Sequence, residues 1–191
     1  MSAARLAFIL GLLTATAPAA AESTAGAMQA FGLVGIWSTD CSIDMAQRCT
    51  NVTNCMPRVI FAVPLFGAPT REFVYPPFPP GLGQPKFTTT SIDSAIRITE
   101  DKLKIVYHVT TSITGLASYV LPVNGELWET VYEKAGNKIH IWSSRRADGG
   151  KIGAENGFMT APGENWKPED GPVKVWRQTE RMAPVLERCV N

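Results

Sequence analysis

The strongest constraint on the fold of this chain is a run of alternating apolar and polar residues broken by tight-turn sequences. Residues 126–134 read ELWETVYEK and residues 138–146 read KIHIWSSRR, separated only by the turn sequence AGN at 135–137. Further turn sequences, NG at 124–125 and DGG at 148–150, flank this pair. Alternation with a period of two predicts half-buried strands, and Asn-Gly favours hairpins because both turn residues must take positive φ. This stretch therefore predicts consecutive antiparallel strands.

Similar strand signals recur along the chain, and no long amphipathic helix accompanies them. Residues 24–32 predict only a short helical turn, with Ser23 or Thr24 as its cap and Gly32 as its stop. The pattern predicts an all-β fold of eight or nine short strands, an antiparallel meander that closes into a barrel or folds into a sandwich. Besides the strands above, the expected strands lie within 33–42, 58–66, 71–77, 90–99, 102–111, 119–123 and 172–181. A hairpin turn is expected at 100–101, and proline-rich loops are expected at 75–85 and 159–172.

The first 21 residues predict a signal peptide. Arg5 gives the positive start, an apolar run follows, and Ala19-Ala20-Ala21 fits the small-residue cleavage rule. The remainder, 22–191, has the length of a single domain. Removing Arg5 from the 18 basic residues leaves 17, equal to the 17 acidic residues. This balance argues against binding to nucleic acid, which needs a concentrated basic face. We expect an exported protein, periplasmic or extracellular, with no integral membrane segment after cleavage.

Four cysteines follow the predicted cleavage site, in a compartment where disulfides persist. Four thiols permit three pairings. We favour Cys49–Cys55, which closes a short loop rich in Asn and Thr, together with Cys41–Cys189, which ties the first strand to the last residues. A zinc site is the alternative, but the ligand spacing and the compartment are both unfavourable, so no metal is expected.

Motifs of catalysis are absent from the sequence. It contains no G-x-S-x-G, no H-E-x-x-H and no phosphate-binding glycine loop. The two histidines, His108 and His140, each lie within a predicted strand, where a lone histidine is usually a packed or surface residue. An enzyme that uses one of them is the least favoured hypothesis, and no cofactor is expected.

Aromatic residues gather in or beside the predicted strands. Alternation places Trp128, Thr130 and Tyr132 on one face, and His140 with Trp142 on one face of the next strand. The simple interpretation is core packing. The alternative is a barrel interior that binds a small apolar molecule, with loop aromatics at its mouth. The ligand-binding residues predicted on that basis are Phe73, Tyr75, Phe78, Tyr107, Trp128, Tyr132 and Trp142.

The arrangement of Gly35-Ile36-Trp37 on the first strand, after a helical turn and before a meander, resembles the lipocalin and wider calycin group. The tail APVLERC, with an early cysteine after GIWSTDC, is also similar to that of small exported bacterial lipocalin-like proteins of unassigned function. The resemblance implies that Trp37 plugs the closed end of a lipocalin-like barrel. It also implies that an arginine near the end of the last strand, Arg177 or Arg181, packs over the indole.

These observations predict a non-catalytic binding or carrier protein for a small apolar ligand. The alternative is a structural or interaction protein of the cell envelope with a filled barrel, whose proline-rich segment 75–85 forms the contact surface. The sequence leaves the oligomeric state open.

Overall fold

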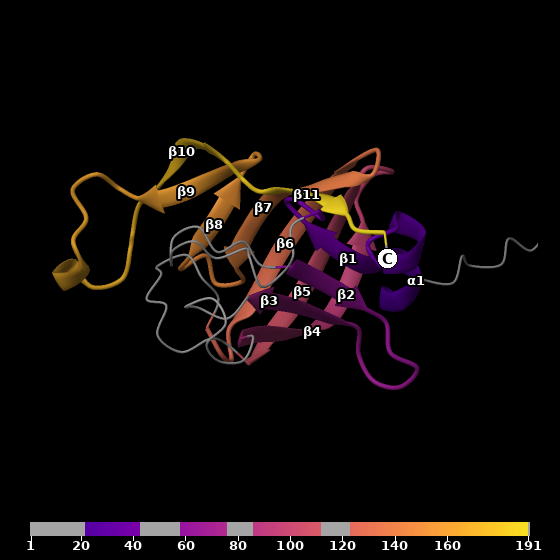
Figure 1. Ribbon diagram of the computed structural model, residues 1–191. Coiled ribbons are helices and arrows are strands. Elements are labelled where there is room, and N and C mark those ends of the chain that lie inside the picture. The colour runs from indigo at the N-terminus through magenta and orange to yellow at the C-terminus, as the bar shows by residue number, and fades with distance from the viewer. Residues whose placement is uncertain (1–21, 43–57, 76–85, 112–122, 191) are drawn as a thin grey trace, which may run out of the picture.

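The computed structural model describes residues 22–42, 58–75, 86–111 and 123–190, and these form an all-β fold with one short helix near the N-terminus (Figure 1). The predicted fold class is therefore confirmed. The strands are β1 (Gly35–Ser38), β2 (Arg58–Ala62), β3 (Thr70–Tyr75), β4 (Lys86–Arg97), β5 (Lys102–Thr111), β6 (Leu127–Ala135), β7 (Lys138–Arg146), β8 (Ile152–Glu155), β9 (Phe158–Pro162), β10 (Trp176–Met182) and β11 (Val185–Arg188).

Eight of these strands form a closed antiparallel barrel. Strands β1 to β6 pair in sequence order. Strand β11 pairs with both β1 and β7, and the pairing of β6 with β7 closes the ring β7-β11-β1-β2-β3-β4-β5-β6. Within the described ranges, β2 and β3, β4 and β5, and β6 and β7 are antiparallel neighbours joined by short connections. The β6–β7 hairpin forms at the predicted turn 135–137, whereas the expected strand at 119–123 is described only at Val123, which is not in a strand. Closure removes the free edges that an open sheet of this length would expose.

Strand β7 belongs to the barrel and also to a sheet extension. Its first residues, Lys138 to His140, pair with β11, whereas Ser144 and Arg145 near its end pair with β8. Strands β8, β9 and β10 continue from there and lie to one side of the barrel (Figure 1). A three-residue 3-10 helix, η3 (Pro168–Asp170), lies in the connection between β9 and β10.

The structure contains more strands than the eight or nine predicted. The hairpin of β8 and β9 turns at Asn156-Gly157, where both residues have positive φ. This Asn-Gly pair is a hairpin signal that the sequence interpretation overlooked. Strand β9 also occupies the first part of the expected loop at 159–172, and the short strand β11 follows Pro184. Both are too short for alternation to identify them.

Helix α1 (Thr24–Phe31) forms where the sequence predicted a helical turn. The side chain of Ser23 accepts a hydrogen bond from the amide of Gly26 at 3.0 Å, and Gly32 ends the helix in the left-handed conformation at φ 79°. Both are the expected capping roles of these residue types. Lys134 donates to the carbonyl of Phe31 at 3.1 Å, which anchors the end of the helix to the barrel.

One contiguous core extends from α1 into the barrel interior, where it includes Phe61, Tyr107 and Tyr132. Ala27, Met28 and Phe31 of the helix share this core with Leu33 and Trp37, and all five are at most 2% exposed. The helix packs against β4 and β5. Within the described part of the chain, no helix has the length and apolar character needed to cross a membrane.

Candidate functional site in the barrel interior

The barrel interior is lined by side chains that alternate along each strand, as the period-two pattern predicted. On β5 and β6, Tyr107, Trp128, Thr130 and Tyr132 are all buried to 1% exposure. Phe73 of β3 is partly buried and packs against the same core. Four of the predicted ligand-binding aromatics, Phe73, Tyr107, Trp128 and Tyr132, therefore lie together inside the barrel.

A buried arginine lies among these aromatic residues. Arg71 of β3 is only 2% exposed, and it is the one charged residue in the buried set of the described chain. Its guanidinium carbon lies 3.8 Å from the centre of the Tyr107 ring and 4.7 Å from that of Phe73. Its Nη1 donates a hydrogen bond to the Tyr132 hydroxyl at 2.9 Å. The cation thus contacts two aromatic rings and one phenol hydroxyl.

The two remaining nitrogens of Arg71 are buried. Neither Nε nor Nη2 has a hydrogen-bond partner among the described residues. The ion pairs among the described residues also leave Arg71 out. Burying a charge without a counter-ion lowers the stability of the folded state, typically by several kcal/mol. Native proteins therefore rarely retain such a charge without a partner.

The electrostatic surroundings keep this guanidinium charged. Burial by itself lowers the pKa of Arg71, but the phenol groups of Tyr107 and Tyr132 outweigh that effect and raise it above its ordinary value. Burial also raises the pKa of Tyr132, so its hydroxyl keeps its proton at neutral pH. The cluster therefore presents one positive charge beside the protonated hydroxyl of Tyr132.

A short chain of hydroxyl groups continues the polar cluster across the barrel wall. The Tyr107 hydroxyl lies 3.3 Å from Oγ1 of Thr130, which in turn lies 2.9 Å from Oγ of Ser144. On the other side, Thr90 donates to the carbonyl of Arg71 at 3.1 Å. The side chains of β4 to β7 thus place a polar belt inside an otherwise apolar interior.

The remaining predicted ligand-binding residues do not join this cluster. Trp142 lies on the outer side of the wall, where Lys102 is 3.8 Å from the centre of its ring and His140 packs beside it. Ile139 faces the core, so regular alternation along β7 places His140 and Trp142 on the outer face. Trp142 is also the extra residue where the pairing shifts from Ile141 opposite Tyr132 to Ser143 opposite Val131. Tyr75 is in β3 with its side chain undescribed, and Phe78 lies outside the described residues.

Trp37 lies in the core beside α1, and its indole donates to the carbonyl of Leu33 at 2.7 Å. The arginine nearest its ring is Arg188, at 6.0 Å from the ring centre, and not Arg177 or Arg181. Both of the predicted arginines are on β10, in the extension and exposed, because β11 rather than β10 is the last barrel strand. Arg188, rather than either predicted arginine, is therefore the one that lies beside the Trp37 ring.

Gly35 of the Gly-x-Trp sequence makes room for Arg188. A Cβ atom on Gly35 would lie 3.3 Å from Nε and Nη2 of Arg188, and its φ of 143° is one that other residues rarely adopt. With that space left free, Arg188 donates to the carbonyl of Val34 at 2.8 Å. The glycine therefore permits the contact between the first and last barrel strands.

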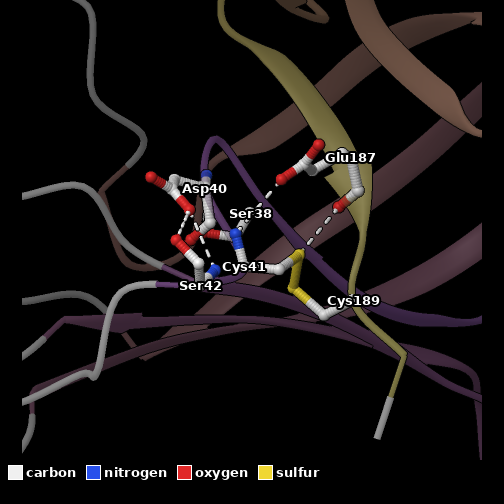
Figure 2. The surroundings of a disulfide bond; sticks show 6 residues. All are labelled: Ser38, Asp40, Cys41, Ser42, Glu187 and Cys189. Atoms are coloured by element: carbon white, nitrogen blue, oxygen red, sulfur yellow. Dashed lines mark hydrogen bonds between the residues drawn. A yellow bond between two sulfur atoms is a disulfide. The ribbon is translucent and has the colours of Figure 1, made fainter.

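A disulfide closes the same seam, as predicted for Cys41 and Cys189 (Figure 2). The amide of Cys189 donates to the carbonyl of Ile36 at 2.9 Å, and that of Cys41 donates to the Glu187 carboxylate at 3.2 Å. The bond thus follows directly on the β1–β11 pairing. The other predicted pair, Cys49–Cys55, lies outside the described residues.

The two histidines lie on the outer side of the barrel. Nδ1 of His108 is 2.6 Å from the Asp93 carboxylate, and Nε2 of His140 is 2.8 Å from that of Glu133. His108 pairs across to Leu127 at the start of β6, whereas His140 pairs with Glu133 near its end. Each histidine has a carboxylate neighbour, but the two do not converge on one cleft. Over the described ranges, no group of His, Cys, Asp and Glu side chains is arranged to hold a metal ion.

Arg71 is the residue of this cluster that the sequence interpretation did not identify as part of the site. The signal was present, because Arg71 and Phe73 are two residues apart on one strand and must share a face. Placing Phe73 inside the barrel therefore also placed a cation there. No protein-family model, curated protein or solved structure that was compared with the chain matches it.

Proposed function

We propose that this protein is a non-catalytic binding or carrier protein that holds a small, largely apolar molecule inside its barrel. The closed wall and the aromatic and aliphatic side chains that line it support this proposal. Ligand sites of this kind are mostly apolar, with a few polar groups that orient the ligand. The Arg71, Tyr107 and Tyr132 cluster supplies such groups.

The observation that carries the proposal is the pair of unpartnered nitrogens on Arg71. A barrel interior that served only as a core would be at least as stable with an apolar residue here, since buried charges are often replaced at no loss. A ligand that accepts these hydrogen bonds accounts for the arginine. On this proposal, the site binds a molecule that accepts hydrogen bonds from Nε and Nη2 of Arg71.

The proposal includes export from the cytoplasm. The Cys41–Cys189 disulfide supports it, because such bonds persist mainly in oxidising compartments. The predicted signal peptide at 1–21 lies outside the described residues.

Ligand binding is tested on the full mature chain purified with its disulfide intact. We expect mass spectrometry of an organic extract to reveal a co-purified molecule in stoichiometric amount. We also expect the uncharged fluorescent probe N-phenylnaphthylamine to bind saturably to delipidated protein. If no molecule co-purifies and no probe binds, the carrier proposal is wrong, and the filled-barrel envelope protein becomes the better account.

A further inference from the structure

We infer that the ligand is a monocarboxylic acid with an apolar body, and that its carboxylate binds Arg71. This inference rests on the proposed binding function and specifies the chemical class of the ligand. It is argued from the charge of the site, the geometry of its free donors and the character of the surrounding wall.

The charge of the site calls for an anion. Arg71 is buried and charged, yet no carboxylate among the described residues pairs with it. An entering anion would neutralise the guanidinium in a region of low dielectric, where the attraction between opposite charges is strongest. Because Arg71 is the one charged side chain among the buried residues that the structure describes, a single negative charge suffices. A phosphate dianion would bring more charge than this site balances.

The free donors have the geometry of carboxylate recognition. Nη1 is occupied by the Tyr132 hydroxyl, whereas Nε and Nη2 are free. Nε and Nη2 form the side edge of a guanidinium, where two N–H bonds run parallel and match the two oxygens of one carboxylate. Tyr132 is thus a positioning residue, because its hydroxyl holds the guanidinium by the nitrogen that this edge does not use.

The surrounding wall suits an apolar body. Phe61 and Phe73 lie beside the arginine on β2 and β3, and the Phe61 ring packs edge-on against Tyr132 at 5.5 Å between centres. Ile105 and Val109 line β5 on either side of Tyr107. A ligand with a second charged group would find no described counter-charge among these side chains, so the remainder of the molecule is uncharged.

The test compares ligands that differ only at the head group. The delipidated full chain is first loaded with N-phenylnaphthylamine. Dodecanoic acid, dodecanol and methyl dodecanoate are then titrated in separately, and displacement of the probe reports binding. We expect the acid to bind roughly ten- to a hundredfold more tightly than either uncharged analogue, the range typical of hydrogen bonds to a charged group. The comparison needs no variant, so it remains informative even if changes at Arg71 impair folding.

Two variants assign the preference to Arg71. Arg71→Gln removes the charge, and we expect the acid to lose its advantage over the alcohol while the alcohol still binds. Arg177→Gln, an exposed arginine on β10 outside the barrel, is the matched control and should retain the advantage.

The outcomes separate this inference from the proposed function. If the alcohol and ester bind as tightly as the acid, the barrel is a binding site and the carboxylate inference is wrong. A preference for the acid that survives in folded Arg71→Gln also overturns it. If none of the three ligands nor the probe binds, the proposed function itself fails.

Discussion

At the scale of single residues, the most unusual feature is a charged side chain, Arg71, buried beside two tyrosines. Tyr107 and Tyr132 both contact the guanidinium of Arg71, but in different ways. Tyr132 accepts its hydrogen bond, whereas Tyr107 offers its ring face and bonds to Thr130. Because hydrogen bonds to charged groups are stronger than neutral ones, the two phenol groups are predicted to differ in their contribution to stability.

Tyr132→Phe is predicted to destabilise the protein more than Tyr107→Phe. The first change leaves a third nitrogen of Arg71 without a partner and is expected to cost about 1.5–3 kcal/mol, whereas the second loses a neutral bond worth about 0.5–1.5 kcal/mol. Urea unfolding monitored by tryptophan fluorescence measures both. Equal losses, or a larger loss for Tyr107→Phe, would contradict the assigned hydrogen bonds.

Trp37→Ala is predicted to lower the free energy of unfolding by about 3–5 kcal/mol, because it leaves a cavity beside α1 that the rigid wall does not fill. The indole is 1% exposed and its N–H is bonded within the same core. Phe66→Ala, at a side chain that is 92% exposed, is the control and is expected to change stability by less than about 0.5 kcal/mol. A thermal melt of Trp37→Ala that matches the parent would disprove the role given to Trp37.

At the scale of elements, one carboxylate joins the start of β6 to the end of β7 and the turn into β8. Glu126 accepts hydrogen bonds from Lys151 at 2.7 Å, from Arg146 at 3.0 Å and from the Trp128 indole at 3.0 Å. It also accepts the amide of Val123 at 2.9 Å. Partial burial by itself raises the pKa of Glu126, but these bonds outweigh it and hold the pKa below its ordinary value of 4.5.

The stability contributed by Glu126 is therefore predicted to depend on pH in a defined direction. The folded state favours the ionised form, so the contribution is complete above pH 4.5 and is lost as the pH falls through the lower folded-state pKa. Glu126→Gln should be less stable at neutral pH and should lose less stability on acidification. Urea midpoints measured on both sides of pH 4.5 test this.

Glu129→Gln is the matched control for this experiment, because among the described residues the Glu129 carboxylate forms one ion pair, with the exposed Arg145 at 3.3 Å. Exposed pairs of this kind contribute little. If Glu126→Gln and Glu129→Gln show the same dependence on pH, the cluster at Glu126 does not join these elements as described.

At the scale of the whole molecule, closure of the barrel depends on β11 and on the disulfide beside it. Strand β11 has four residues and pairs with β7 on one side and with β1 on the other. The Cys41–Cys189 bond spans 148 positions of the chain, so it restricts the unfolded state strongly. The chain-entropy model gives a contribution of about 5 kcal/mol for a loop of this length.

The double variant Cys41→Ser/Cys189→Ser is predicted to have a free energy of unfolding about 5 kcal/mol lower than that of the parent, by the same chain-entropy model. Chemical denaturation under oxidising conditions measures the loss. As a control, a reducing agent should destabilise the parent more than the double variant. A variant that unfolds at the same denaturant concentration as the parent would show that β11 holds the seam without the bond.

The sequence by itself determined the local structure of this protein. Alternation fixed the inward faces of β5 and β6, the turn at 136–137 fixed a hairpin, and Ser23 and Gly32 fixed the limits of α1. These signals act between residues a few positions apart, so they can be seen in the chain alone. The sequence also favoured the pairing of Cys41 with Cys189 among three possible pairings, and the structure confirms that bond.

Only the tertiary structure decided which strands meet at the seam and which side chains meet inside the barrel. The contact between Arg71 and Tyr132 joins residues 61 positions apart, and it depends on ring closure through β6 and β7. The choice of Arg188 over Arg177 depends on β10 leaving the barrel while β11 returns to it. Both contacts depend on the pairing of strands that are far apart in the sequence. The free energy of that pairing is shared among many residues, so no short stretch of sequence encodes the pairing.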